Sequence, residues 1–540
     1  MREHSHQQPT PTGFAGEWNN PRHAYNRYQS MSVATVAPGE SIRKSGDTFA
    51  TGVMVMLLLN FVQRLVGLLR GLGFCHFLSD VELGQWALVN SFLVIGVPIA
   101  VLGLPGSFGR FVETFRSRNQ LGDYFRRVAV VSFCGLTIAC TTILIFPQQF
   151  SWLLFRETTT FGLVVWCVIT FISITIFSFI YDMVGSLREV RTVSLMQFTQ
   201  SVVFGVVGLS VLSVRPSWNM LLPSFTIACL LATLPGLLVL LSSYRCEFRR
   251  APRAAQFNGR ELWARILPYA AALWVMNLLG NLFEVSDRYM LLHLIPGAEQ
   301  VGQALVGQYH CGRILPNLLT SIALMLGGIL LPYISADWEA GQPQRIAARL
   351  RQVMQSVSIG FTLLAIAAMC VAPLLFHYGF HDRYQQAEAI LPISMTQAIW
   401  VSLFTVAQSY LLCIERGKRL AALMVAGLLL NLLLNWWLIQ QWGLFGAVLA
   451  TSTANIFTLL LLLWQMNRHG CSLGWGTLVL CLTPLSVAAG PVVATITLLI
   501  MVAIAGRTSW LLSPNDRQQI DAALLPQLER LGIRLQTLWP

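Results

Sequence analysis

Residues 161–181 read FGLVVWCVITFISITIFSFIY and contain no charged side chain. A helix needs about 20 apolar residues to cross the ~30 Å hydrocarbon core of a bilayer, and this run is long enough. It lacks the strict alternation of apolar and polar residues that a transmembrane β-barrel strand requires. The run therefore predicts a membrane-spanning helix, because lipid-exposed backbone must satisfy its hydrogen bonds within its own segment.

The composition of the whole chain extends this prediction. Of the 540 residues, 55% are hydrophobic and 11% are charged, whereas soluble domains carry about 25% charged residues. These values exclude a water-soluble enzyme, and the 11% of aromatic residues excludes a disordered chain. The 11 cysteines are scattered without a CxxC pair, which predicts small packing residues and neither a metal site nor a cofactor. We expect an all-α integral membrane protein.

Apolar runs of similar length recur along the chain. We expect spans at 49–70, 85–105, 125–146, 161–182, 192–213 and 221–243, then at 266–290, 303–331, 354–376, 388–413, 420–439 and 443–466. A further apolar stretch at 475–505 contains Pro484 and Pro491, which predict a hairpin of two short helices. The range is therefore 12 to 14 spans, and we expect 14.

The basic residues indicate the orientation. With the amino terminus inside, the inner loops hold 20 Lys and Arg side chains, and five lie outside: Arg70, Arg156, Arg215, Arg288 and Arg383. Cytoplasmic loops carry the excess of Lys and Arg in membrane proteins. The sequence thus predicts a multi-pass protein of the cytoplasmic (inner) membrane with a cytoplasmic amino terminus.

The most basic stretch, 244–265, divides the spans into two sets of six. We expect a disordered cytoplasmic tail at 1–47, six-helix lobes at 48–243 and 266–466 joined by the basic linker 244–265, the additional segment 475–505 and a cytoplasmic tail at 506–540. Leu83-Gly84-Gln85-Trp86 in span two is echoed by Val306-Gly307-Gln308-Tyr309 in span eight. Internal repeats of this kind are common in secondary transporters, whose substrate path lies between the repeats.

The segments between the spans argue against an enzyme. None is long enough for a nucleotide-binding domain, and no G-x-x-x-x-G-K-[ST] motif occurs. The outer loops are short and carry few acids, whereas a membrane glycan polymerase needs placed carboxylates. Transport driven by the chain's own ATPase is excluded, and we expect no enzyme.

Span one carries polar residues that are costly in lipid. A charged side chain at the centre of a spanning helix costs about 2.5–3.5 kcal/mol on insertion scales. The spacing of Asn60, Arg64, Gly67 and Gly71 places all four on one helix face. Arg64 is either a fixed cation that attracts an anionic ligand into a cavity or the partner of a group on a neighbouring helix.

Spans seven and eight also carry polar residues along one helix face. In span seven, Asn277, Asn281, Glu284 and Arg288 follow the same spacing, with Asp287 adjacent; the cluster either closes an outer gate or holds a carboxylate coupled to ion or proton movement. In span eight, His310, Arg313 and Asn317 share a face, and the helix is expected to bend at its glycines and Pro316. His310 is either a titrating group or a hydrogen-bonded structural histidine.

We therefore name two sets of candidate residues. The substrate-binding set is Asn60, Arg64, His310, Arg313 and Asn317. The coupling or gating set is Asn281, Glu284, Asp287 and Arg288. Deep cations in a two-lobed helical carrier suit a substrate with a large anionic group.

Several motifs resemble a known family. The sequence LGQWAL at 83–88, continuing through Pro98 to LGLPGSFGRFVE at 102–113, resembles span two of bacterial polysaccharide flippases of the O-antigen type. These belong to the multidrug/oligosaccharidyl-lipid/polysaccharide (MOP) exporter superfamily. Similar motifs are DRY at 287–289, VGQY at 306–309, YQQAEAILP at 384–392, GKR at 417–419, Asn431, Asn435 and GLFGA at 443–447. Together the resemblance runs from about residue 50 to 466.

The resemblance implies the function as well as the fold. It implies two six-helix lobes around a cationic cavity and the translocation of a polyprenyl-pyrophosphate-linked oligosaccharide, with Arg64 and Arg313 contacting the pyrophosphate or acidic sugars. The implied partners are the lipid-linked oligosaccharide, membrane lipids and polysaccharide assembly machinery, with no nucleic acid and a monomeric state. Two alternatives remain: an ion-coupled multidrug or small-molecule antiporter of the same superfamily, and a membrane-embedded envelope glycan polymerase.

Overall fold

The computed structural model describes residues 49–248 and 259–507, with side chains from residue 62 onward apart from Gly506. The described residues do not include the predicted tail at 1–47, residues 508–540 of the predicted tail at 506–540, residues 249–258 of the linker or the side chain of Asn60. All contacts reported below lie within residues 54–507, which belong to one compact unit.

The amino-terminal helices correspond to the first six predicted spans. They are α2 (Phe49–Phe77), α3 (Asp80–Ala100), α5 (Leu121–Ile145), α7 (Phe161–Ser186), α8 (Val190–Val214) and α9 (Leu221–Ser243). Shorter elements join them: η1 (Leu104–Ser107), α4 (Phe108–Ser117), α6 (Pro147–Phe155), η2 (Trp218–Met220) and α10 (Arg245–Phe248). Helix α7 packs against α3, α5 and α9, and α9 packs against α8.

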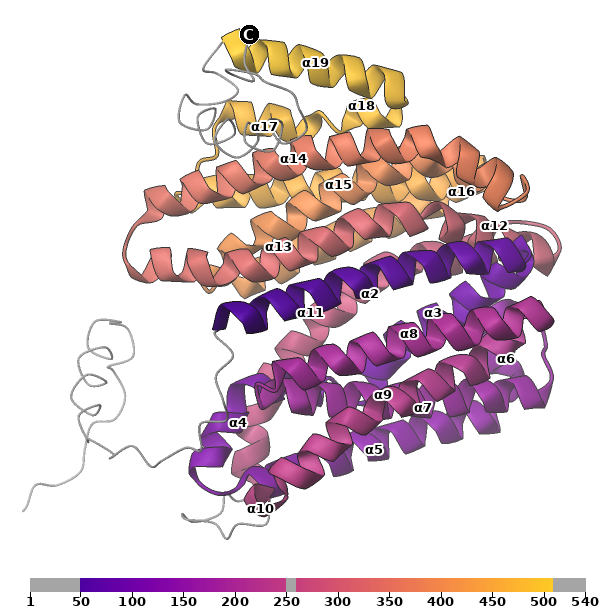
Figure 1. The fold of residues 1–540 in the computed structure, drawn as a ribbon, viewed down its shortest axis with the longest axis vertical. Helices are drawn as coiled ribbons and strands as arrows, with labels where there is room; N and C mark the ends of the chain where they lie inside the picture. The colour runs from indigo at the N-terminus through magenta and orange to yellow at the C-terminus, as the bar shows by residue number, and fades with distance from the viewer. Residues whose placement is uncertain (1–48, 249–258, 508–540) are drawn as a thin grey trace, which may run out of the picture. The chain divides into compact units, whose positions relative to one another are not determined.

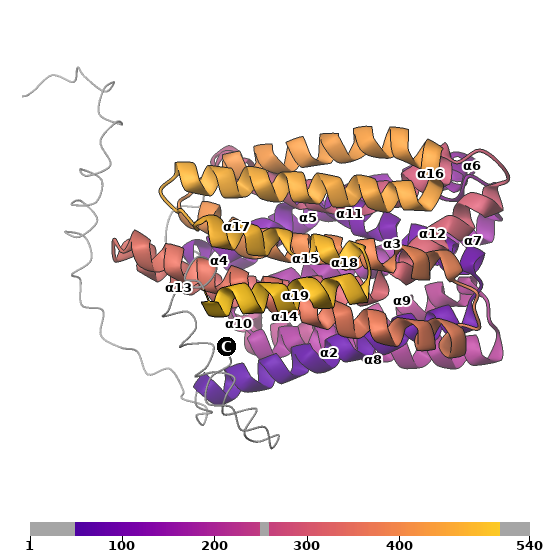
Figure 2. The same cartoon turned by 90° about the horizontal axis from the view of Figure 1, so that it is seen from above.

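The carboxyl-terminal helices pack around α15. They are α11 (Gly259–Leu294), α12 (Glu299–Gly312), α13 (Ile314–Glu339), α14 (Pro343–Leu374), α15 (Gln385–Cys413) and α16 (Gly417–Arg468). Helix α15 contacts α12, α13, α14 and α16. In Figures 1 and 2 the long helices run roughly parallel, with α5 to α9 in one half of Figure 1 and α13 to α19 in the other.

The helix lengths confirm an all-α membrane protein. Ten helices in the described part are long and apolar enough to cross a membrane. Helix α16 is counted once among them but holds two predicted spans, because the chain turns at Gly443, where φ is 53°. Helix α2 corresponds to the first predicted span.

The structure corrects the prediction of one continuous span at 303–331. This region is two helices, α12 and α13, that meet at Arg313. The break follows from Pro316, which has no N–H to donate to the carbonyl of Gly312 and therefore interrupts the hydrogen-bond ladder. The glycines and proline in this stretch predicted a bend, and the structure shows two separate helices.

The stretch 475–505 forms the predicted hairpin. It contains α17 (Trp475–Leu482), α18 (Leu485–Ala488) and α19 (Pro491–Arg507). Pro484 cannot donate to the carbonyl of Leu480, and the hydroxyl of Ser358 on α14 donates to this carbonyl instead. Trp400 on α15 donates its indole N–H to the carbonyl of Cys481 at 3.1 Å. The hairpin is thus bonded to the carboxyl-terminal helices, while the count of 14 spans stays a prediction.

The repeated motifs of the sequence meet at one end of the helices. This end contains residues 78–80, 295–299 and 380–384, and we call it the outer end because the charge distribution predicts that it faces away from the cytoplasm. A Cβ atom on Gly84 would lie 1.8 Å from the carbonyl oxygen of Gln303, and one on Gly307 would lie 1.9 Å from that of Asp80. Helices α3 and α12 therefore cross at a distance that only glycine permits. The two similar sequences, 83–86 and 306–309, therefore lie where α3 and α12 cross, and the glycine of each faces the backbone of the other helix.

At the same end, one arginine from each half of the chain donates hydrogen bonds to the other half. Arg156, which precedes α7, donates to the carbonyls of Leu292 and Ile295 at the end of α11, at 3.3 and 3.0 Å. Arg383, which precedes α15, donates to the carbonyls of His76 and Leu78 at the end of α2. Helix carboxyl ends carry unpaired carbonyls and partial negative charge, which an arginine satisfies. Each half thus supplies an arginine that hydrogen-bonds to the carboxyl end of the first helix of the other half.

Removing both arginines should loosen the outer end. In the Arg156→Gln/Arg383→Gln variant we expect the buried thiols of Cys75 and Cys311 to react about tenfold faster with a membrane-impermeant maleimide, because a charge-assisted hydrogen bond contributes about 1.5–3 kcal/mol. The measurement is the labelling rate of each cysteine by peptide mass spectrometry. Arg215→Gln, which removes an exposed arginine, is the control. Equal labelling in all three proteins would mean that these bonds do not hold the end closed.

Candidate functional site

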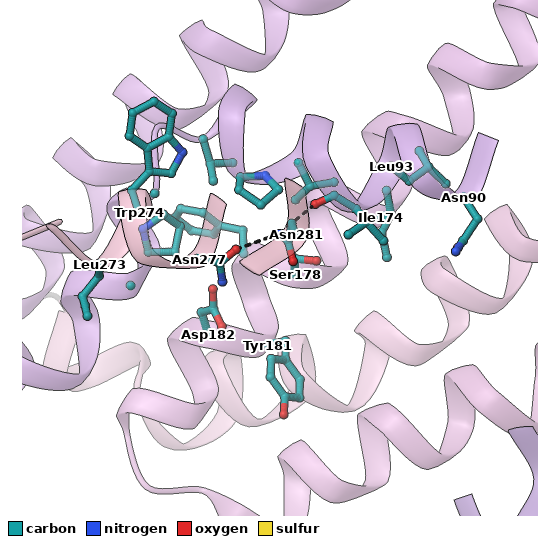
Figure 3. Close-up of a pocket in the computed structure, with 18 of the residues that line it drawn as sticks. Asn90, Leu93, Ile174, Ser178, Tyr181, Asp182, Leu273, Trp274, Asn277 and Asn281 are labelled. Atoms are coloured by element: carbon teal, nitrogen blue, oxygen red, sulfur yellow. Dashed lines mark hydrogen bonds between the residues drawn. The ribbon is translucent and has the colours of Figure 1, made fainter. Parts of the chain in front are cut away.

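A cavity of about 650 Å³ lies among α3, α7, α9, η1 and α11 (Figure 3). We call it the asparagine cavity, after Asn90, Asn277 and Asn281. Its other polar side chains are those of Ser178, Tyr181, Asp182 and Trp274, and the remainder of its lining is mostly apolar. Ligand pockets typically enclose about 300–1,000 Å³ and combine apolar walls with a few placed polar groups. The asparagine cavity has both properties.

Pro98 explains why an asparagine of α11 faces this cavity. Pro98 lies inside α3 and has no N–H for the carbonyl of Val94, one turn earlier. The side-chain amide of Asn281 donates to this carbonyl at 3.3 Å, and also to Oδ1 of Asn277 at 2.8 Å. Figure 3 shows the bonds of Asn281, with Asp182 supplied by α7. Pro98 thus leaves a carbonyl of α3 at the wall of this cavity, and a side chain of α11 bonds to it.

A second cavity, of about 330 Å³, is cationic. We call it the arginine cavity, after Arg64 and Arg70 on α2. His310 on α12 and Asn317 on α13 also line it. No Asp or Glu is present among the lining residues of the described chain. The predicted residues Arg64, His310 and Asn317 thus come together here from helices distant in sequence.

Polar atoms of the arginine cavity are left without partners. Nε of Arg64 and Nδ1 of His310 are buried, and neither has a hydrogen-bond partner in the described structure. The Arg70 guanidinium lies 4.8 Å from the centre of the Phe204 ring, a cation–π contact that leaves its charge unneutralised. Buried polar groups are normally hydrogen-bonded. The orphaned N–H of Arg64 and the unbalanced positive charge indicate a site for an anionic ligand.

The two cavities adjoin. Asn90 on α3 and Phe225 on α9 line both of them. The two cavities are therefore neighbours, with Asn90 and Phe225 between them.

Arg313 does not line either cavity, although we predicted it as a substrate-binding residue. Its side chain is buried and donates to the hydroxyl of Tyr309 at 2.9 Å. Arg313 lies one turn after Tyr309, which puts the two side chains in reach of each other. The structure therefore places Arg313 against a hydroxyl of the preceding turn, and its role in substrate binding stays a prediction.

Asp287 is the centre of a buried polar cluster. Its carboxylate is fully buried and accepts hydrogen bonds from neutral donors: Tyr309 at 2.5 Å, Thr451 at 2.6 Å, Asn435 at 2.7 Å and Asn431 at 3.3 Å. None of the ion pairs seen in the described part of the chain includes Asp287. The Tyr309 hydroxyl also accepts a hydrogen bond from Arg313 at 2.9 Å, so it joins the Asp287 carboxylate to a buried cation.

The other members of the predicted coupling set lie in different surroundings. Arg288 is buried and donates to the hydroxyl of Ser91 on α3 at 2.7 Å, which bonds the two halves together. Glu284 is half exposed and lies 4.0 Å from Arg288. Asn281 belongs to the asparagine cavity. The set therefore does not form one cluster.

The sequence does not indicate three of the residues that line the cavities: Arg70, Asp182 and Trp274. Arg70 was counted as an outer cation because span one was expected to end there, whereas α2 continues to Phe77. Asp182 is the last residue of the predicted span 161–182, and α7 continues to Ser186. Trp274 lies in span seven and carried no sequence signal. A longer helix boundary would have brought Arg70 and Asp182 into consideration.

Comparisons with known proteins agree with this architecture. Residues 49–338 match the family described as polysaccharide biosynthesis protein. The lipid II flippase MurJ of Bacillus subtilis (strain 168) is 22% identical over 453 residues, covering 77% of this chain and 82% of that protein. An uncharacterized membrane protein of Methanocaldococcus jannaschii is 24% identical over 152 residues, covering 28% of this chain and only 30% of that protein.

Solved structures share the fold. A lipid II flippase MurJ in an inward closed conformation has a TM-score of 0.62 at 13% identity, over 84% of this chain and 99% of that chain. A MATE protein in complex with MaL6 has a TM-score of 0.55 at 12% identity, over 77% and 94%. An inward-facing multidrug resistance MATE transporter of the MOP superfamily has a TM-score of 0.52 at 12% identity, over 77% and 98%.

The family match covers more than half of the chain and confirms the resemblance found in the sequence. The solved structures show that the helices follow the arrangement known from MOP superfamily transporters. The chain is therefore a multi-pass membrane protein of the polysaccharide biosynthesis protein family, with a fold of the MOP exporter superfamily.

Proposed function

We propose that this protein flips a lipid-linked oligosaccharide across the cytoplasmic membrane, with the amino terminus on the cytoplasmic side. The observation that carries the proposal is the arginine cavity, where Arg64, Arg70 and His310 gather without a carboxylate among the described lining residues. Such a site favours a pyrophosphate, because guanidinium groups bind phosphate oxygens through charge-assisted hydrogen bonds. The relatives named as flippases support the same assignment.

Alternating access would move the headgroup. The outer end is closed by the crossing of Gly84 and Gly307 and by the bonds of Arg156 and Arg383. We propose that residues 48–243 and 266–466 act as two lobes that separate at this end after the headgroup has entered from the cytoplasmic side. The lipid tail would remain in the bilayer while the headgroup passes between the lobes.

Binding to short-chain probes tests this assignment. The full-length protein in detergent should bind farnesyl diphosphate, measured by the fluorescence of its tryptophans, since Trp86 and Trp274 line the two cavities. Farnesol, which has the same chain without phosphates, should bind at least about tenfold more weakly. A protein that binds ethidium but not farnesyl diphosphate would overturn the proposal and favour the multidrug antiporter.

The buried carboxylate of Asp287 provides a candidate for energy coupling. Asp287→Asn keeps the size of the side chain and removes its charge. We expect gradient-driven flipping in proteoliposomes to fall at least about tenfold, while farnesyl diphosphate binding stays unchanged because Asp287 does not line the arginine cavity.

Asp123→Asn is the control for this substitution, because Asp123 pairs with Arg127 away from the cavities. An Asp287→Asn protein that flips at the normal rate under the same gradient would remove Asp287 from the mechanism.

A further inference from the structure

We infer that the asparagine cavity holds a sugar unit without an acidic group, and that the arginine cavity beside it holds the diphosphate. This inference rests on the proposed function and adds the chemical class of the sugar next to the diphosphate. The argument depends on the charges of the two cavities, on their unused hydrogen-bonding groups and on their contact.

The charges of the two cavities are opposite. Among the described residues, the arginine cavity carries Arg64 and Arg70 and no acid, whereas Asp182 is the one charged residue that lines the asparagine cavity. An acidic sugar placed there would approach a like charge, without a cation to offset it, in a space of low dielectric. The cavity therefore selects against uronic acids and other anionic sugars.

The asparagine cavity offers hydrogen-bonding groups suited to hydroxyl or acetamido groups. The amide of Asn281 uses its N–H groups on Val94 and Asn277, and its carbonyl oxygen is not used in any bond seen in the described structure. Nε1 of Trp274 is buried without a hydrogen-bond partner among the described residues. Two hydroxyls of a sugar can satisfy these groups, one donating to the amide oxygen and the other accepting from the indole.

The walls of the cavity suit a sugar ring. Leu93, Val97, Ile174 and Leu273 supply apolar surface beside the polar groups. A pyranose ring presents C–H groups on its faces and hydroxyls around its rim, which matches this mixture. Because Asn90 and Phe225 line both cavities, the ring held here would be the one attached to the diphosphate.

Three probes that share a farnesyl diphosphate group test the inference: farnesyl diphosphate itself, its N-acetylglucosamine conjugate and its glucuronic acid conjugate. Binding is measured with the full-length protein in detergent. We expect the N-acetylglucosamine probe to bind about tenfold more tightly than farnesyl diphosphate, and the glucuronic acid probe to bind no more tightly than farnesyl diphosphate.

Two substitutions assign these effects to the cavity. Asp182→Asn should improve binding of the glucuronic acid probe by about tenfold and leave farnesyl diphosphate unchanged. Trp274→Phe keeps a ring but removes the N–H, and it should weaken the N-acetylglucosamine probe about fivefold. Asp123→Asn is the matched control for the loss of a carboxylate.

The outcomes separate the two proposals. Equal affinity for the neutral and acidic probes, unaffected by Asp182→Asn, would overturn the inference and leave the flippase proposal standing. Failure of all three probes to bind would overturn the proposed function itself. For each variant, the affinities of the three probes are compared within the same protein sample. A folding defect would weaken the binding of all three probes together. The expected change, in contrast, affects one probe relative to the others.

Discussion

Replacing Arg64 and Arg70 with glutamine is expected to reduce flipping by at least about 100-fold. A hydrogen bond to a charged group contributes about 1.5–3 kcal/mol, and two such bonds to a diphosphate would together contribute about 3–6 kcal/mol. Each 1.4 kcal/mol corresponds to a factor of ten in an equilibrium constant. Among the described residues, Arg64 and Arg70 are the two arginines that line the arginine cavity, and no other Lys or Arg lines it. The measurement is the initial flipping rate in proteoliposomes, together with farnesyl diphosphate affinity.

Two further variants show whether a loss of flipping comes from the lost positive charges or from a folding defect. Arg64→Lys/Arg70→Lys keeps both charges and should retain a measurable part of the activity, although lysine lacks the bidentate geometry of arginine. Arg215→Gln removes an exposed cation outside the cavities and should change nothing. A glutamine double variant with a normal rate and affinity would show that the arginine cavity does not hold the anionic group.

The second large effect is expected from a single methyl group at the outer end. Gly84→Ala would place a Cβ atom 1.8 Å from the carbonyl oxygen of Gln303, which is backbone and cannot turn aside as a flexible side chain does. The two helices must then separate, and overpacking of this kind typically costs about 1–3 kcal/mol. We expect the outer end to open, the thiol of Cys75 to become reactive toward a membrane-impermeant maleimide, and flipping to fall by about tenfold or more.

The control is Gly360→Ala in α14, where an added Cβ meets nothing within 4 Å. Alanine is favoured over glycine inside a helix by about 1 kcal/mol, so this variant should be as stable as the original protein or more stable. Alanine is also intrinsically favoured over glycine at position 84. A loss of stability or of flipping in Gly84→Ala must therefore come from the crossing of α3 and α12. A Gly84→Ala protein with unreactive Cys75 and normal flipping would contradict a closed crossing at this end.

Much of the fold follows from local properties of the sequence. Apolar length is a local property, and it located the long helices. Pro316 and Pro484 lack the N–H that continues a helix, and both predicted bends or breaks became ends of helices in the structure. The errors lie at helix ends, where α2 and α7 extend beyond the apolar run and bring Arg70 and Asp182 into the cavities.

The candidate site was harder to predict because its residues come from distant helices. Periodicity placed His310 and Asn317 on a common face, and the structure finds both at the arginine cavity. The same periodicity included Arg313, whose side chain instead meets Tyr309. Helical spacing defines a face, but the neighbouring helices decide whether that face meets a cavity or another side chain.

The cluster around Asp287 shows the same limit. The sequence indicates Asn431 and Asn435 only as motif residues, and the structure shows that both amides donate to the carboxylate of Asp287. The sequence separation between these residues leaves no local pattern from which the cluster could be predicted. The packing of α11 against α12 and α16 brings the carboxylate and its donors together.

The sidedness of lipid-linked oligosaccharide in cells depleted of this protein tests the central claim most directly. Spheroplasts from such cells would be treated with a membrane-impermeant enzyme that modifies the glycan, and the modified fraction would be compared with that of undepleted cells. We expect the lipid-linked intermediate to accumulate in a form protected from the enzyme, and expression of the original protein, but not of the Arg64→Gln/Arg70→Gln variant, to restore its exposure. An unchanged modified fraction, with increased sensitivity of the depleted cells to cationic drugs, would contradict the flippase and favour the antiporter.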